Sequence, residues 1–193
     1  SLLSLQEQSV ESQDTQDVFA ESRGRVTSMA LIHEQLYRSS SLSEIRVDHY
    51  IEQLLHRLVS AYQGERDIGL MLKLEPVSLS IDQAIPFGLI INELVTNALK
   101  HGFREREGGT VTVSSSVEED AVCFVVQDDG AGLPQGFDLA TAASLGLQIV
   151  SMLAEQLHGK LGVESSEGTR FKLCFPLQRS ISPGLRPGSA GPA

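Results

Sequence analysis

The stretch NELVTNALKH, Asn92 to His101, decides how this chain folds. Residues four apart share one face of a helix, and residues seven or eight apart continue that face. One stripe is therefore polar and contains Glu93, Asn97, Lys100 and His101. The other side is apolar and contains Phe87, Ile91, Leu94, Val95 and Ala98. Buried polar groups are costly without partners, so we expect the polar stripe to face a pocket that holds a metal ion and phosphates.

The composition limits the classes of partner. The chain has 193 residues, of which 41% are hydrophobic, enough for one full core and a smaller appendage. With 15 basic and 25 acidic residues the net charge is −10, which argues against binding to nucleic acid or to an anionic membrane. A protein partner or a small ligand fits better.

Two further features indicate a soluble protein of the cytoplasm. Cys123 and Cys174 each lie in a run typical of a strand, and we expect both to be reduced core thiols. The longest apolar runs, such as 84–91, are far shorter than the ~20 residues that span a membrane. We find no signal peptide and no pair of His or Cys residues at the spacing of a zinc site.

The first third of the chain has a helical pattern. A polar break near residues 5–17 separates two helices, and the second, about 14–38, carries a heptad seam. A third helix is predicted over 47–62, with Asp48 as its N-cap. Its apolar face contains Ile51, Leu54, Leu55, Leu58 and Val59. A narrow seam usually pairs with another chain, so we expect residues 1–62 to form part of a dimerisation bundle.

Beyond Gly64 the hydrophobic period falls to two, which indicates strands. We expect strands to residue 81, then a helix that Asp82 caps, with Pro86 in its first turn and an end at Gly102. Two strands over 110–127, a helix over 144–157 and a closing hairpin over 160–175 follow. The fold class is α+β: a helical hairpin, then an α/β sandwich over residues 63–178. The tail 179–193 is rich in Pro, Gly and Ser and should be disordered.

Two glycine-containing stretches complete the pattern. In QDDGAGLP, Asp128 ends a strand, and Gly130 and Gly132 let the backbone turn and approach a ligand closely. A carboxylate there can accept a hydrogen bond from an amine such as that of adenine, although an ordinary tight turn is the alternative. In SLGLQIV a helix begins behind Gly146, and the amides of a helix N-terminus favour phosphate. Together the stretches predict a pocket for a nucleoside triphosphate.

This ordered set resembles the GHKL ATPase family, whose Bergerat fold is shared by gyrase, chaperone ATPases and histidine kinases. NELVTNALKH matches the N box, DDGAG the G1 box, SLGLQIV the G2 box and EGTRF a G3-like glycine, over about 64–177. The resemblance implies ATP and Mg²⁺ as cofactors, magnesium on Asn97, phosphates near Lys100 and adenine on Asp128. The cofactor-binding residues that it implies are Asn97, Lys100, His101, Asp128, Gly130, Gly132, Gly146, Leu147 and Thr169.

Glu93 departs from the pattern of many histidine kinases, which have an asparagine there. A carboxylate at this position can act through the metal shell or assist a nucleophile, so we assign Glu93 as the catalytic residue. The alternative is simple pairing with Lys100 or His101. Two other functions remain open: a phosphotransfer scaffold whose ATP site is degenerate, and an ATPase that hydrolyses ATP with Glu93.

The front of the chain indicates the branch of the family. SLLSLQ at the start and the run from Arg25 resemble the dimerisation bundle of histidine kinases whose acceptor helix reads H-R-V-K-N-N-L-Q. That resemblance implies a homodimer, an acceptor histidine upstream of Ser1 and a response regulator receiver domain as partner. His33 is the alternative acceptor, but a hydrogen-bonded histidine in the helical seam is the more ordinary interpretation. We therefore expect the ATP-binding part of a sensor kinase.

Overall fold

In the computed structural model, the described residues are 44–62, 66–104, 106–141 and 144–178, with Ser22, 24–26 and Ala30 before them. Most of the predicted helix 14–38, including His33, and the tail 179–193 lie outside these residues. The described helices and strands are β1 (Glu44–Arg46), α3 (Val47–Tyr62), β2 (Asp67–Lys73), β3 (Ser78–Ser80), α4 (Ile81–Asn97), η1 (Ala98–Gly102), β4 (Gly108–Glu118), β5 (Ala121–Asp128), η2 (Leu139–Thr141), α5 (Leu145–Gln156), β6 (Lys160–Ser166) and β7 (Gly168–Pro176).

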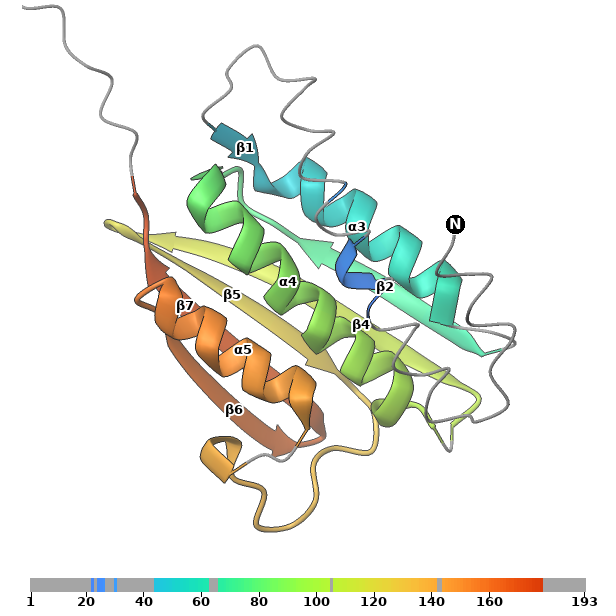
Figure 1. The fold of residues 1–193 in the computed structure, drawn as a ribbon. Coiled ribbons are helices and arrows are strands. Elements are labelled where there is room, and N and C mark those ends of the chain that lie inside the picture. The colour runs from blue at the N-terminus through green and yellow to red at the C-terminus, as the bar shows by residue number, and fades with distance from the viewer. Residues whose placement is uncertain are drawn as a thin grey trace, which may run out of the picture.

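The strands form a mixed sheet with the order β2-β4-β5-β7-β6, in which only the β2–β4 pair is parallel. β1 and β3 form a separate antiparallel pair. The helices α3, α4 and α5 cover one face of the large sheet, with α4 in the middle (Figure 1). This arrangement confirms the predicted sandwich of helices on a sheet. None of the helices that the structure describes is long and apolar enough to cross a membrane.

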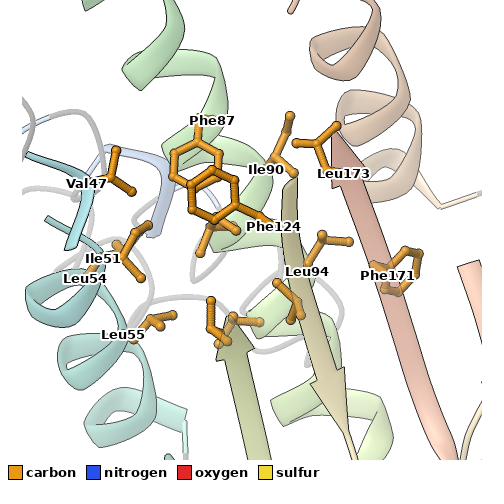
Figure 2. Packing of buried hydrophobic residues seen from close by; sticks show 14 of the residues in the cluster. Val47, Ile51, Leu54, Leu55, Phe87, Ile90, Leu94, Phe124, Phe171 and Leu173 are labelled. Atoms are coloured by element: carbon orange, nitrogen blue, oxygen red, sulfur yellow. The ribbon is translucent and has the colours of Figure 1, made fainter. Parts of the chain in front are cut away.

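The helix α3 spans the predicted residues 47–62, and its predicted apolar face is buried. That face packs on α4 and the sheet, and Figure 2 shows Ile51 and Leu54 among the side chains of this core. The N-cap prediction was wrong, because the helix begins at Val47 and Asp48 lies within its first turn. Asp48 binds the guanidinium of Arg46, and this hydrogen bond holds the pKa of the Asp48 carboxyl below its usual value.

The helix α4 is the buried centre of the domain. Ile81 starts it rather than ending a strand. Ser80 occupies the N-cap position that the sequence predicted for Asp82, which lies in the first turn. Pro86 therefore lies inside the helix, and the prediction that placed it in the first turn was wrong. The helix continues as the π-helical segment η1 to Gly102, where the sequence predicted its end. π-Helical turns are frequent at functional sites.

Aromatic packing fixes α4 on the sheet. The ring of Phe87 lies 4.2 Å from that of Phe124 on β5 and 5.9 Å from that of Phe175 on β7, between ring centroids. Figure 2 shows Phe87 and Phe124 in contact between helix and strand. Burial of a side chain of this size stabilises the fold by about 1.5–3 kcal/mol. This contact anchors the helix that carries the polar stripe.

The cysteines correct one expectation. Cys123 and Cys174 form a disulfide, whereas the sequence predicted two reduced thiols. They lie directly opposite each other on the neighbouring strands β5 and β7, a register that joins residues 51 apart in the chain. The sequence placed both cysteines in strands but did not show that these strands are neighbours. The same register pairs Asp128 with Thr169 five residues along, so the disulfide joins the two strands that carry these residues.

Candidate functional site

A cavity of about 350 Å³ opens between the C-terminal half of α4 and the ends of β5 and β7. It receives polar side chains from the predicted stripe and from both strand ends, and its walls are largely apolar. The lining residues are Leu94, Asn97, Ala98, His101, Gly102, Val126, Asp128, Gly132, Leu133, Pro134, Ser144, Leu147, Thr169 and Phe171. The structure thus brings together Asn97, His101, Asp128, Gly132, Leu147 and Thr169 of the predicted site. A space of this size, with few polar groups, is typical of small-ligand sites.

Asp128 is the most buried charged group of the cavity, with 4% of its surface exposed. Its Oδ1 accepts hydrogen bonds from the backbone N–H groups of Gly130, at 2.9 Å, and Thr169, at 3.3 Å. Burial raises the pKa of the Asp128 carboxyl above its ordinary value, and hydrogen bonds from the two amides and from the side chain of Thr169 oppose that rise. The carboxyl is therefore held in one orientation inside an apolar space, where an additional donor from a ligand would be favourable.

The turn after Asp128 depends on glycine. A side chain at Gly130 would overlap the backbone of Gly102, because the turn packs closely on the end of η1. The Ala131 N–H donates to the Gly102 carbonyl oxygen at 2.9 Å, which fixes that approach. Gly132 has φ +76°, a backbone conformation that side chains rarely adopt. Gly130 therefore supports the cavity from behind, whereas Gly132 lines it.

The start of α5 forms one edge of the cavity. Ser144 is the N-cap residue, and its Oγ accepts a hydrogen bond from the N–H of Leu147 at 3.4 Å. Gly146 follows and is buried. Amides in this first turn point out of the helix and favour a negative charge. Ser144 and Leu147 line this edge of the cavity, whereas Gly146, which the sequence also assigned to the site, does not line it.

Glu93 does not line the cavity, although it belongs to the predicted stripe. Its Oε1 accepts from Nε of Arg25 at 2.8 Å, and its Oε2 accepts from Nη2 of Arg25 at 3.1 Å. Asn92 donates a further hydrogen bond to Oε1 at 3.3 Å. The pairing with Lys100 or His101 that we considered as an alternative is replaced by a pair with Arg25. No feature of the sequence around Arg25 predicted this contact.

Lys100 also lies apart from the cavity. Its ammonium group is 5.7 Å from the ring centroid of Tyr62 on α3, a cation–π distance. Residues 98–102 form the π-helical segment η1, whose i→i+5 turns are longer than those of an α-helix, so His101 rather than Lys100 continues the face of Asn97 and lines the cavity.

Several cavity residues were not predicted, and they form the apolar walls. Val126 and Phe171 precede or follow Asp128 and Thr169 by two positions, so strand alternation places them on the same face of the sheet. That periodicity could have identified them from the sequence. Leu133 and Pro134 come from the loop, and no regular pattern marks such positions.

The described residues offer no independent metal site. They contain no group of three or more His, Cys, Asp or Glu side chains that could hold a metal ion. Asn97 is the amide side chain that lines the cavity. Magnesium commonly binds through one or two protein oxygens together with substrate phosphates and water. The donor set therefore fits a magnesium ion that arrives with a phosphate chain.

Comparison with known proteins gives two family matches. Residues 82–179 match the family described as histidine kinase-, DNA gyrase B- and HSP90-like ATPase, and residues 1–62 match a family described as histidine kinase. The chain is 34% identical over 182 residues to the sensor histidine kinase PdtaS of Mycobacterium tuberculosis, covering 92% of this chain and 36% of that protein. It is 28% identical over 160 residues to the blue-light-activated histidine kinase 2 of Erythrobacter litoralis, covering 80% of this chain and 46% of that protein.

The solved structures agree with these matches. The histidine kinase domain of the Erythrobacter litoralis blue-light-activated histidine kinase superposes with a TM-score of 0.74 at 26% sequence identity. The match covers 81% of this chain and 75% of that domain. The chain spans less than half the length of the two curated relatives named above.

Proposed function

Because this chain belongs to the family of histidine kinase-, DNA gyrase B- and HSP90-like ATPases, and within it to the sensor histidine kinases, we propose that it binds Mg-ATP in the cavity beside α4 and donates the γ-phosphoryl group to a histidine. The phosphoryl group then passes to the receiver domain of a response regulator, and the working unit is a homodimer.

The buried carboxyl of Asp128 is the observation that supports this proposal most strongly. Two backbone amides hold its Oδ1, and the exocyclic amine of adenine would donate a hydrogen bond to Oδ2. The purine lies between apolar walls that include Leu94, Val126 and Phe171. A buried acceptor discriminates strongly against a base that lacks the matching donor, because the acceptor would then have no hydrogen-bond partner.

The phosphates extend from this base toward the start of α5, where the first-turn amides near Gly146 complement negative charge. The amide oxygen of Asn97 supplies a protein ligand for magnesium, which would neutralise phosphate charge when bound. Lys100 reaches the phosphates only after leaving the ring of Tyr62. Phosphoryl transfer depends mainly on positioning and charge neutralisation, and these residues supply both.

Glu93 remains the group that we propose to assist the attacking imidazole. In the arrangement described above, both of its oxygens are engaged by Arg25. A role as a base therefore requires Arg25 to withdraw first. The same condition applies to the hydrolytic alternative, since the paired carboxylate does not line the cavity where an attacking water would lie.

Binding of a non-hydrolysable ATP analogue with and without Mg²⁺ tests the proposal. The wild-type protein should bind the analogue more tightly with Mg²⁺, and Asn97→Ala should lose most of that gain. Adenosine, which has no phosphates to hold the metal, serves as the control and should bind both proteins equally with or without Mg²⁺. An Asn97→Ala protein that keeps the full magnesium dependence would contradict the assignment of Asn97.

A further inference from the structure

An arginine outside the ATP-binding domain reaches the polar stripe of α4. Arg25 lies in the helical residues 24–26, 68 positions before Glu93, and meets its carboxylate with two hydrogen bonds of 2.8 and 3.1 Å. The exposed fraction is 20% for the Arg25 side chain and 4% for that of Glu93. A two-point contact between guanidinium and carboxylate fixes direction as well as distance. The pair therefore ties the helical residues 24–26 to α4 at one defined place.

Glu93 in turn lies against the start of α5. A methyl group at Gly146 would stand only 2.8 Å from Oε2 of Glu93, so the carboxylate and the first turn of α5 are direct neighbours. Gly146 belongs to the segment that the proposed function assigns to the phosphates. A carboxylate at this place without a cation would repel a phosphate chain, and the repulsion is strong because the site is largely screened from water.

Arg25 removes that repulsion. With Arg25 in contact, the net charge of the pair is zero beside the first turn of α5. Without it, a buried negative charge remains within reach of the ligand's phosphates. The state of this one contact therefore affects the phosphate end of the cavity, whereas Asp128 and the purine walls lie elsewhere in the lining.

The contact between residues 24–26 and α4 also has features that favour its separation. A methyl group at Gly24 would meet Oδ1 of Asn92 at 3.1 Å, so the helical segment lies close to α4 beside the ion pair. Oδ1 of Asn92 and Oγ1 of Thr96, one turn further along α4, are buried and have no hydrogen-bond partner among the described residues. Buried polar atoms without partners weaken an interface, because each would gain a hydrogen bond in water.

From these observations we propose that Arg25 is a positioning residue that neutralises Glu93, so that the cavity accepts a nucleotide's phosphates well only while the helical residues 24–26 are docked on α4. The inference rests on the proposed function. It adds a coupling between the two regions, and such coupling is reciprocal: bound ATP must stabilise docking by the same factor by which docking strengthens ATP binding.

Binding measurements with two ligands test this coupling. The affinities for adenosine and for a non-hydrolysable magnesium-ATP analogue are measured by calorimetry on the wild type, Arg25→Ala, Arg25→Lys and the double variant Arg25→Ala/Glu93→Gln. Arg25→Ala should bind the ATP analogue on the order of ten-fold more weakly, with adenosine unchanged. Arg25→Lys keeps the charge and should recover most of the loss. The double variant removes the uncompensated carboxylate and should return to the wild-type affinity.

Arg57→Ala is the matched control, because it removes one positive charge from the exposed side of α3. It should leave the ratio of the two affinities unchanged. The proposal is overturned if Arg25→Ala leaves that ratio unchanged, if the double variant stays as weak as Arg25→Ala, or if Arg57→Ala has the same effect. Adenosine binding separates this failure from that of the proposed function: a wild type that binds neither ligand contradicts the function itself.

Discussion

The two ends of the polar stripe on α4 have different environments. Asn97 and His101, near the C-terminal end, line a cavity, whereas Glu93, one turn earlier, is covered by Arg25. The side chains alone suggested a single surface for one ligand. The difference shows that one polar helix face can have two environments, depending on what packs on it. The open half, Asn97 and His101, can bind a ligand. The covered half, Glu93, can respond to the docking of another segment.

The largest expected effect concerns the turn that closes the open half. Gly130→Ala places a methyl group on the backbone of Gly102, which cannot move without displacing the end of η1. We expect a loss of stability of about 3 kcal/mol, together with loss of nucleotide binding. Urea unfolding measures it. Gly162→Ala is the control, since nothing lies within 4 Å of a methyl group there; equal losses in both variants would contradict the packing described.

The disulfide gives the next effect. It joins β5 and β7, whose ends carry Asp128 and Thr169 on the open side. Replacing both Cys123 and Cys174 by alanine should lower the free energy of unfolding by about 2–4 kcal/mol. Adenosine binding should weaken, because the paired strand ends lose a constraint. A reducing agent should lower the stability and the adenosine affinity of the wild type and leave both unchanged in the variant. Equal stability of the wild type and the variant before reduction would contradict the presence of the disulfide.

A smaller effect concerns Asp128, whose replacement should change stability and binding in opposite directions. Burial raises the pKa of Asp128, so keeping it ionised costs stability at neutral pH. Asp128→Asn should therefore be more stable than the wild type at pH 7, because asparagine keeps the acceptor for Gly130 and Thr169. The difference should begin to shrink as the pH falls below the raised pKa, where the folded carboxyl takes up a proton, and vanish below the ordinary pKa of about 3.9. Thermal melts across pH 3–8 measure it; a variant less stable at every pH would contradict this account.

The smallest expected effects are changes in ligand affinity at two adjacent residues of the stripe. His101 lines the cavity, whereas Lys100 lies over Tyr62. We expect His101→Ala to weaken adenosine binding by about ten-fold, through lost contact with the base. Lys100→Met should leave adenosine binding unchanged and weaken ATP binding by no more than about two- to five-fold. If Lys100→Met weakened ATP binding more than His101→Ala does, Lys100 would have to turn into the cavity when ligand binds.

Local patterns predicted most of the fold. Alternating hydrophobic residues predicted β2, β4, β5, β6 and β7, and helical periodicity predicted α3 with its bounds. Both patterns are local, because the residues that form them lie close together in the sequence. The errors near α4 concern Ile81, Asp82 and Pro86, where a strand pattern passes directly into a helix. The short strand β1 was not predicted, since three residues give too little periodicity.

The candidate site was harder to predict than the fold because it depends on distant contacts. Asp128 and Asn97 were found from glycine turns and helix spacing, which are local signals. The pair Arg25–Glu93 and the disulfide join residues 68 and 51 positions apart, and neither is visible without knowing which elements are neighbours. Periodicity gives the face on which a residue lies, whereas the partner on that face comes only from the three-dimensional structure.

The most direct test of the central claim, that the open half of the stripe binds an adenine base, compares two neighbouring carboxylates. Asp128 is buried in the cavity, whereas Asp129 is exposed and accepts a hydrogen bond from the N–H of Thr110 at 2.8 Å. Calorimetric titration with adenosine should show Asp128→Asn at least about 30-fold weaker than the wild type and Asp129→Asn within about two-fold of it. Equal affinities in all three proteins, or no binding by the wild type, would contradict the account.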